Sequence, residues 1–169
     1  MKRFRVIFMG TPEFAVPCLA ALYGSCEVIG VVTQPDKPRG RGQKLVPSPV
    51  KAWAVAHGLT VWQPSRIKDE AFTAFLEEQH PDLMVVVAFG QILSQRILDI
   101  PPYGCINVHG SLLPRYRGAA PMQWCVIDGE TKTGVTTMFM DAGLDTGICC
   151  SKQNSPSVRI RRWRRSMMD

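Results

Sequence analysis

The chain has 169 residues, of which 46% are hydrophobic and 20% charged, and its formal net charge is +6. This length and composition suit one globular domain with a single core and exclude two full domains. The apolar runs, such as residues 84–89, are far shorter than the roughly 20 residues that a membrane span needs. The basic and then apolar start reaches Gly10 without a small-residue cleavage site, so we expect a cytoplasmic chain that begins with a buried strand.

Most of the positive charge lies near the end of the chain. Residues 151–169 hold six Lys and Arg side chains against one Asp, so the remainder is near neutral. None of the six cysteines forms a CxxC pair, and a zinc site therefore has no support. Four of them fall inside apolar patterns and are expected to be small buried thiols: Cys18, Cys26, Cys105 and Cys125.

Strand and helix signals alternate from the N-terminus. Short apolar or β-branched runs predict strands at residues 5–9, 28–32, 60–62, 83–88, 105–108 and 135–139. Helical spacing of apolar residues predicts helices at residues 14–22, 49–57, 69–79, 94–98 and 119–127. This alternation predicts an α/β fold, an open and mostly parallel Rossmann-like sheet with helices on both faces.

Ligands bind such sheets beyond the carboxyl ends of the strands, which directs attention to residues 107–121 and 141–147. The first strand ends in Gly10-Thr11-Pro12-Glu13-Phe14, which is not GxGxxG, so a dinucleotide fingerprint is absent. Residues 34–49 form a long basic connection between predicted elements. They are either exposed surface or a clamp on a polyanion, whose phosphates would contact Lys37, Arg39, Arg41 and Lys44.

The strand at 105–108 leads into the most informative segment. Alternation places Asn107 and His109 on one face at its carboxyl end, where an amide and an imidazole can bind a developing oxyanion. A nearby carboxylate could orient the imidazole, and Asp141 and Asp145 are the candidates. From spacing alone, a structural role for His109 remains the alternative.

Asn107-x-His109, followed by Ser-Leu-Leu-Pro-Arg-Tyr-Arg-Gly-Ala-Ala-Pro at 111–121, resembles the signature of folate-dependent formyltransferases. Asp145, in Gly-Leu-Asp-Thr-Gly, is similar to their catalytic aspartate. The opening at 8–15 and the loop at 34–42 resemble the subfamily that formylates methionyl initiator tRNA. The resemblance covers residues 1–147 and departs at Gly110, where the family has Ala.

This resemblance implies formyl transfer from 10-formyltetrahydrofolate to the α-amino group of methionyl initiator tRNA, without a metal. Asn107 and His109 would donate hydrogen bonds to the formyl oxygen, and Asp145 would hold His109 and help to remove the amine proton. Residues 34–49 would contact the acceptor stem, Arg41 foremost. The folate would contact Phe89, Gly90, Gln91, Ile92, Leu93, Ser111, Leu112, Leu113 and Pro114, although Phe89 and Leu93 could equally be core residues.

The resemblance is lost after Gly147, where the family continues close to Asp-Met-Leu-Leu and this chain reads Ile-Cys-Cys-Ser. Deletion of one base from a set of codons for Asp-Met-Leu-Leu gives codons for Ile-Cys-Cys-Ser. We therefore expect residues 148–169 to be an out-of-frame basic tail, and the chain to be a monomeric, truncated catalytic domain of uncertain activity. The rest of the sheet and the family's C-terminal β-barrel would be absent. A genuine RNA-binding tail is the alternative.

Two other functions stay open. The first is another 10-formyltetrahydrofolate-dependent formyltransferase, acting on a sugar nucleotide or a nucleotide precursor. Residues 11–14 form no phosphate cradle, which disfavours an enzyme acting on a nucleotide precursor. The basic loop at 34–49 is the feature that distinguishes an enzyme acting on tRNA from one acting on a sugar nucleotide. The second is a non-catalytic RNA-binding fragment, whose RNA binding would not change on replacement of Asn107 or His109.

Overall fold

The computed structural model describes residues 3–39, 44–143 and 145–156. The chain divides into two compact units after Ile106. In this structure no described helix is long and apolar enough to cross a membrane.

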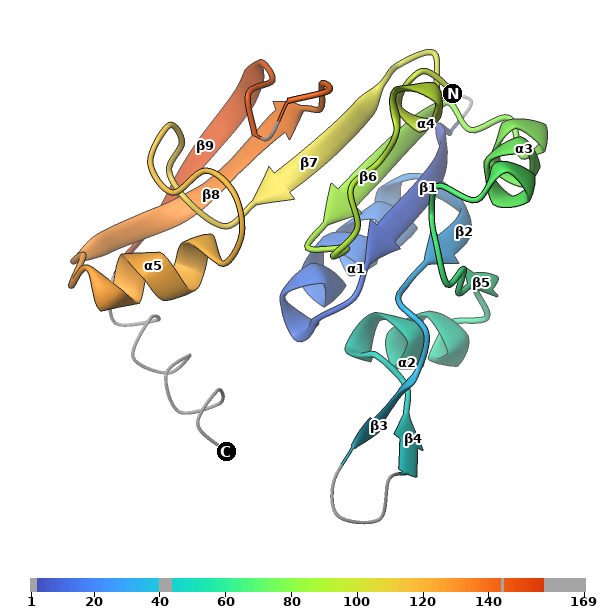
Figure 1. Cartoon of the computed structure of the whole chain (residues 1–169), viewed down its shortest axis with the longest axis horizontal. Helices are drawn as coiled ribbons and strands as arrows, with labels where there is room; N and C mark the ends of the chain where they lie inside the picture. The colour runs from blue at the N-terminus through green and yellow to red at the C-terminus, as the bar shows by residue number, and fades with distance from the viewer. Residues whose placement is uncertain (1–2, 40–43, 144, 157–169) are drawn as a thin grey trace. The chain divides into compact units, whose positions relative to one another are not determined.

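Four parallel strands form the sheet of the first unit (Figure 1). They are β1 (Arg5–Gly10), β2 (Glu27–Val32), β5 (Val61–Trp62) and β6 (Leu83–Val87), in the order β5-β2-β1-β6. Phe8 on β1 is in register with Val31 on one side and with Val85 on the other. The residues of β1 from Val6 to Met9 have no exposed surface, as expected of a parallel strand covered on both faces.

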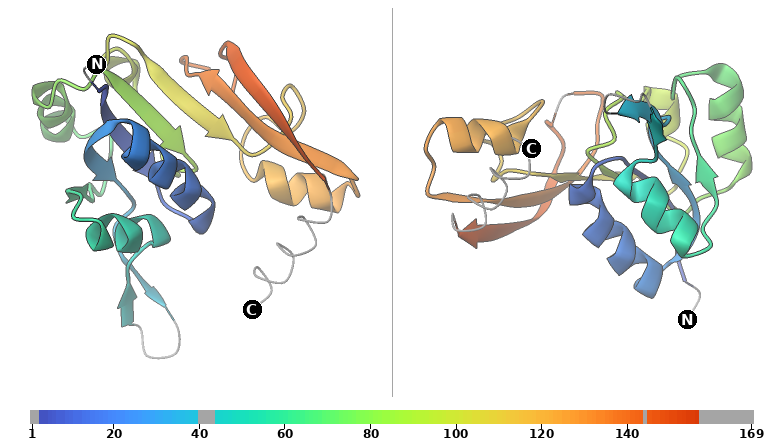
Figure 2. Two further views of the ribbon diagram at one scale, coloured as in Figure 1. Left: turned by 180° about the vertical axis from the view of Figure 1, so that it is seen from behind. Right: turned by 90° about the horizontal axis from the view of Figure 1, so that it is seen from below.

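The helices of this unit pack on both faces of the sheet, with α1 and α2 on one face and α3 and α4 on the other (Figure 2). They are η1 (Glu13–Ala15), α1 (Val16–Ser25), α2 (Pro49–Ala56), α3 (Glu70–Glu78) and α4 (Gln95–Leu98). Side-chain caps define where two of them begin. Ser48 accepts a hydrogen bond from the Lys51 N–H at 3.1 Å, and Asp69 accepts one from the Ala71 N–H at 2.9 Å.

The long connection at 34–49 contains a small antiparallel hairpin that was not predicted. Strand β3 (Lys37–Arg39) pairs with β4 (Lys44–Val46), and Lys37 lies opposite Val46. Arg41 lies outside the described residues. Figure 1 shows the hairpin before the start of α2, extending away from the sheet.

Two of the four cysteines predicted to be buried are buried. Cys105 and Cys125 are 2% and 1% exposed, whereas the prediction is wrong for Cys18 and Cys26, which are only partly buried. Burial raises the pKa of Cys105 to about 12, with a smaller contribution from the charge of Asp99. Burial also raises the pKa of Cys18.

The second unit holds β7 (Cys105–His109) from Asn107 onward, followed by α5 (Pro121–Ile127), β8 (Lys132–Phe139) and β9 (Cys149–Pro156). The strand order is β7-β8-β9, and β8 pairs with β9 antiparallel, with Val135 opposite Gln153. Buried and less buried residues alternate along β8. The predicted α/β fold, with a mostly parallel sheet and helices on both faces, is confirmed.

Strand β9 was not predicted, because it falls within the segment interpreted as an out-of-frame tail. Its sequence, Cys-Cys-Ser-Lys-Gln-Asn-Ser-Pro, has no alternating apolar pattern, and its described side chains are exposed. Pairing with β8 accounts for its extended backbone. Backbone pairing is compatible with many sequences, so the reading frame of this segment stays a prediction.

Candidate active site

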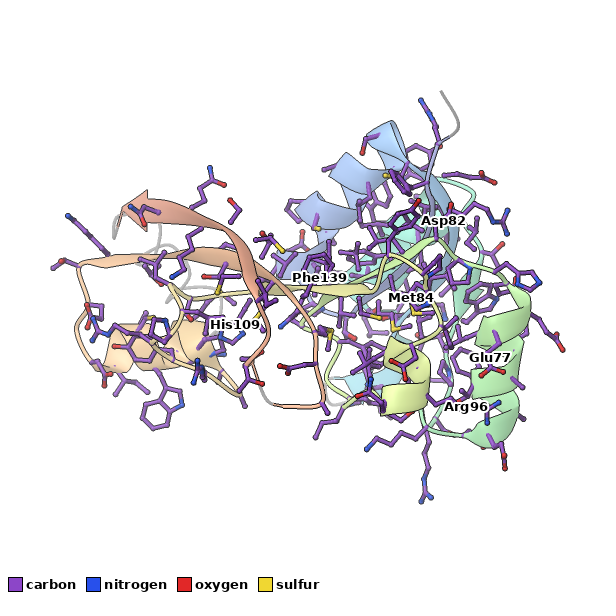
Figure 3. All side chains as sticks on the ribbon, turned by 90° about the horizontal axis from the view of Figure 1, so that it is seen from above. Glu77, Asp82, Met84, Arg96, His109 and Phe139 are labelled. Carbon is purple, nitrogen blue, oxygen red and sulfur yellow. The ribbon has the colours of Figure 1, made fainter. Side chains whose placement is uncertain are left out.

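The second unit brings together the three residues predicted to be catalytic. Asn107 and His109 stand on β7, and Asp145 lies in the loop between β8 and β9. The Nδ2 of Asn107 donates to Asp145 Oδ1 at 3.2 Å, and Nδ1 of His109 lies 3.5 Å from Asp145 Oδ2. Both side chains reach one carboxylate, so they share a face of β7, as alternation predicts. Figure 3 labels His109 on this strand.

The carboxylate of Asp145 is held from a third direction as well. The backbone N–H of Gly118 donates to Oδ2 at 2.7 Å, and the Asp145 side chain is only 10% exposed. Asp141, the other candidate, is exposed and binds its own loop, accepting from the Gly143 N–H at 3.0 Å and the Thr146 hydroxyl at 2.7 Å. Asp145 is therefore the carboxylate beside His109, whereas Asp141 makes hydrogen bonds within the loop that carries Asp145.

Both ring nitrogens of His109 have neighbours. Its side chain is 6% exposed, and Nε2 lies 2.8 Å from the carbonyl oxygen of Tyr116. A carbonyl can only accept, so Nε2 carries the hydrogen of this bond and Nδ1 faces the carboxylate. Donation from Nε2 to a formyl oxygen requires that this hydrogen leave Tyr116. No described residue accepts the second amide hydrogen of Asn107, which can point to such an oxygen directly.

The turn after β7 is held by a residue that sequence reasoning missed. The buried hydroxyl of Thr136 on β8 accepts from the Leu113 N–H at 3.1 Å and donates to the Ser111 carbonyl at 2.7 Å. The Ser111 hydroxyl in turn donates to the Arg115 carbonyl at 2.7 Å. A threonine on a strand is ordinary in sequence, so nothing in the pattern of β8 indicated this role. Of the predicted folate-binding residues here, Pro114 is exposed and Leu112 partly exposed.

The other predicted folate-binding residues, 89–93, lie in the first unit after β6. The Phe89 carbonyl accepts from the Thr11 hydroxyl at 3.1 Å and from Gln34 Nε2 at 3.2 Å, and Gln91 Oε1 accepts from the Ile67 N–H at 2.8 Å. The side chains of Phe89 and Leu93 are buried, in line with the core-packing alternative. Ile92 is 71% exposed and is the apolar side chain of this loop that a ligand can reach.

The basic residues predicted to bind tRNA are only partly described. Lys37 is exposed at the start of the hairpin, and Arg39 and Lys44 belong to its paired strands. The base of the hairpin is anchored by Asp36, which accepts from Lys51 Nζ at 2.6 Å and from Gln63 Nε2 at 2.8 Å. These two hydrogen bonds, first that of Lys51, hold the pKa of Asp36 below its ordinary value.

A separate hollow of about 770 Å³ lies in the first unit and contains none of the predicted site residues. Asp82, which lines it, directly precedes β6, so the hollow lies at the opposite end of that strand from residues 89–93. Figure 3 labels Asp82 together with two other lining residues, Glu77 and Arg96. The described residues contain no group of three or more His, Cys, Asp or Glu side chains that could hold a metal ion.

Comparison with known protein families shows which family this site comes from. The model of the formyl transferase family matches residues 2–160, almost the entire chain. The chain belongs to the formyl transferase family. The match extends beyond residue 147, the last residue covered by the resemblance in sequence motifs.

Curated relatives are similar in sequence but about twice as long. The methionyl-tRNA formyltransferase of Pelobacter propionicus is 60% identical over 157 residues, which are 92% of this chain and 49% of that protein. The methionyl-tRNA formyltransferase of Geobacter metallireducens is 62% identical over 155 residues, 91% of this chain and 50% of that protein. The chain therefore spans about half the length of these relatives.

Solved structures show the same fold at low identity. The phosphoribosylglycinamide formyltransferase of Streptococcus pneumoniae is 18% identical, with a TM-score of 0.74 over 98% of this chain and 94% of that one. A formyltetrahydrofolate deformylase from Pseudomonas syringae covers 98% of this chain with a TM-score of 0.72 and 18% identity, although this matches only 56% of its own length. The fold is thus common to these proteins.

Proposed function

We propose that the chain carries the catalytic residues of a methionyl-tRNA formyltransferase, which transfers the formyl group of 10-formyltetrahydrofolate to the α-amino group of methionine on initiator tRNA. The observation that carries the proposal is the convergence of Asn107 and His109 on the carboxylate of Asp145, at 3.2 and 3.5 Å. The sequence similarity to methionyl-tRNA formyltransferases supports the choice of substrates. The reaction would take place in the cytoplasm.

In the proposed reaction the amine nitrogen attacks the formyl carbon. A C–N bond forms, the bond from that carbon to N10 of the folate breaks, and N10 takes up a proton while the amine loses one. Negative charge gathers on the formyl oxygen in between, so donors aimed at that oxygen lower the barrier. Asn107 supplies its second amide hydrogen, and His109 supplies a ring N–H once that hydrogen leaves the Tyr116 carbonyl.

Asp145 has two roles in this proposal. Its carboxylate fixes the position of Asn107 and His109, because it contacts both side chains and is itself held by the Gly118 N–H. It is also the acceptor toward which the amine proton moves, directly or through a water molecule. A buried, hydrogen-bonded carboxylate is well suited to the first role, since it loses little order during the reaction.

The substrate contacts are proposed from the resemblance together with exposure. The folate-binding residues proposed from the resemblance are 111–114 in the second unit and 89–93 in the first, and within these segments Pro114 and Ile92 are exposed apolar residues. The tRNA phosphates would contact the basic hairpin at residues 37–46, whose Lys37 is exposed. The chain would act as a monomer.

A formyl-transfer assay with the purified chain tests the proposal, using methionyl initiator tRNA and 10-formyltetrahydrofolate. We expect the wild-type chain to formylate methionyl-tRNA, and both Asn107→Ala and His109→Ala to lose at least 100-fold in rate. His57→Ala is the matched control, because His57 is exposed and lies in the other unit. No transfer by a folded wild-type chain, or equal losses in all three variants, would contradict the proposal.

The assay also separates the alternatives. Formylation of an amino sugar nucleotide in preference to methionyl-tRNA would support the sugar-nucleotide enzyme instead. RNA binding without any formyl transfer, unchanged in His109→Ala, would support the non-catalytic fragment.

We also propose that residues 148–169 are read in a shifted frame, on the strength of the Ile-Cys-Cys-Ser sequence at 148–151. Sequencing the gene across codon 148 tests this. A relative with the same tail in an intact reading frame would contradict it.

A further inference from the structure

The segment Tyr116–Ala120 has an unusual backbone. Tyr116, Gly118 and Ala120 have φ of +58°, +90° and +57°, so left-handed conformations recur at every second residue. This backbone conformation is disfavoured for residues other than glycine, and two of the three residues, Tyr116 and Ala120, are not glycine. Such a conformation persists only where surrounding contacts hold it in place.

This segment contacts both members of the His109–Asp145 pair. The carbonyl of Tyr116 accepts from Nε2 of His109 at 2.8 Å, and the N–H of Gly118 donates to Oδ2 of Asp145 at 2.7 Å. One turn of backbone thus offers an acceptor to the imidazole and a donor to the carboxylate. The positions of these two backbone groups depend on the left-handed conformation at Tyr116.

Glu130, in the connection between α5 and β8, contacts the side chain of Tyr116. Its Oε1 accepts from the Tyr116 hydroxyl at 3.2 Å and pairs with the guanidinium of Arg115, which lies 5.2 Å from the centre of the Tyr116 ring. Glu130 is itself fixed, because its N–H donates to the Cys125 carbonyl at 3.0 Å and its side chain is only 23% exposed. Burial raises the pKa of Tyr116 to about 12, and the negative charges of Asp128 and Glu130 add to this, so the phenol keeps its hydrogen at neutral pH.

We propose that Glu130 and Tyr116 are positioning residues, which hold the Tyr116 carbonyl on Nε2 of His109 and so select the tautomer of the catalytic imidazole. Among the described residues, neither side chain makes a hydrogen bond to Asn107, His109 or Asp145. The importance of this tautomer for formyl transfer rests on the proposed function. The effect of Glu130 and Tyr116 on the His109 tautomer does not rest on it.

The tautomer follows from the two neighbours of the ring. While the Tyr116 carbonyl accepts a hydrogen from Nε2, a neutral His109 presents Nδ1 without a hydrogen to Asp145, 3.5 Å away. Once the carbonyl is displaced, the carboxylate is the better remaining acceptor, and the hydrogen of the neutral ring shifts to Nδ1. Loss of the Glu130–Tyr116 contact should therefore increase the Nδ1–H form.

Nitrogen-15 NMR of histidine-labelled chain measures this directly, because the two ring nitrogens have different shifts in each tautomer. The chain has three histidines, and His57 and His80 are exposed, so they serve as internal references for His109. We expect Nε2–H in the wild type at alkaline pH, and a shift toward Nδ1–H in both Tyr116→Phe and Glu130→Gln. Tyr103→Phe and Glu78→Gln, which alter exposed residues of the first unit, should leave His109 unchanged.

Two results would overturn the inference: an Nδ1–H tautomer of His109 in the wild type, which requires no variant, or unchanged His109 shifts in folded Tyr116→Phe and Glu130→Gln. Tyr116→Phe keeps the ring and its packing, and circular dichroism establishes that each variant is folded.

Formyl transfer provides a second measurement. Where the wild-type chain is active, both variants should lose roughly tenfold in kcat with KM within about twofold, because in this proposal both side chains act through His109. The two measurements fail separately. A tautomer shift in an inactive chain supports the inference and contradicts the proposed function. An active chain without a tautomer shift supports the proposed function and contradicts the inference.

Discussion

Gly118 donates its backbone N–H to the carboxylate of Asp145 at 2.7 Å, the shortest of the contacts that converge on this side chain. Asn107 and His109 approach the same carboxylate from β7. The carboxylate therefore accepts from two donors, the Gly118 N–H and the Asn107 amide, which come from separate segments of the second unit, and Nδ1 of His109 lies beside it. Charge-assisted hydrogen bonds of this kind are stronger than neutral ones, so the arrangement depends on a negative charge at Asp145.

Replacement of Asp145 by Asn tests this dependence. The amide has no negative charge and presents hydrogens to the Gly118 N–H and the Asn107 amide, which are themselves donors. We therefore expect at least a 100-fold loss of formyl transfer and a loss of about 1–2 kcal/mol in the free energy of unfolding. Transfer rates and urea denaturation measure the two effects. Asp141→Asn is the control, because Asp141 binds only its exposed loop and should cost less than tenfold in rate. Equal losses in both variants would show that Asp145 has no special role.

The hydroxyl of Thr136 should matter for stability as much as a large core side chain. Thr136→Val keeps the shape but leaves the Leu113 N–H and the Ser111 carbonyl buried without this partner. We expect a loss of about 2–3 kcal/mol in urea denaturation. Thr137→Val is the matched control, since its hydroxyl makes one long contact of 3.5 Å in an exposed position, and should change stability by less than about 0.5 kcal/mol. A loss in Thr136→Val no greater than in the control would refute the role of this hydroxyl.

The first unit was the more predictable because its elements carry their own signals. Ser48 followed by Pro49 indicates where α2 begins, and the uniformly apolar run of β6 indicates a strand covered on both faces. The hairpin β3–β4 and strand β9 lack such signals, since their sequences are basic or polar and their extended conformation comes from pairing with a neighbouring strand. The predicted start of α5 was two residues early, because Ala120 is left-handed and Pro121 opens the helix.

The candidate site, too, was only partly predictable from the sequence. Alternation on one strand placed Asn107 and His109 together, but spacing alone did not choose between Asp141 and Asp145, and the resemblance did. The groups that hold the site in place are largely backbone atoms, namely the Tyr116 carbonyl and the Gly118 N–H. Backbone groups are present in every residue, so no sequence pattern reveals which of them will contact a side chain of the candidate site.

The buried thiol of Cys105 should make the chain sensitive to alkali. In the folded chain the pKa of Cys105 is about 12, against an ordinary value of 9.0 that applies once the chain unfolds. The contribution of the buried thiol is therefore complete below pH 9 and is lost as pH rises toward 12, at about 1.4 kcal/mol per pH unit. Urea denaturation at pH 8 to 11 measures the slope. Cys105→Ala should be less stable at pH 8 but should lose less stability between pH 9 and 11, and parallel slopes would contradict the assignment.

Two glycines of the first unit should respond to alanine with opposite signs. A Cβ on Gly30, in the buried strand β2, would overlap the ring of Trp62 on the neighbouring β5, and that ring already packs edge-on against Phe75 at 5.0 Å. We expect Gly30→Ala to lose about 1–3 kcal/mol through overpacking. A Cβ on Gly24, in the last turn of α1, would meet no atom within 4 Å, so Gly24→Ala should gain about 0.5–1 kcal/mol from helix propensity. Urea denaturation of the two variants measures both changes, and a shift of the same sign in both would show that the contact with Trp62 does not govern the response at Gly30.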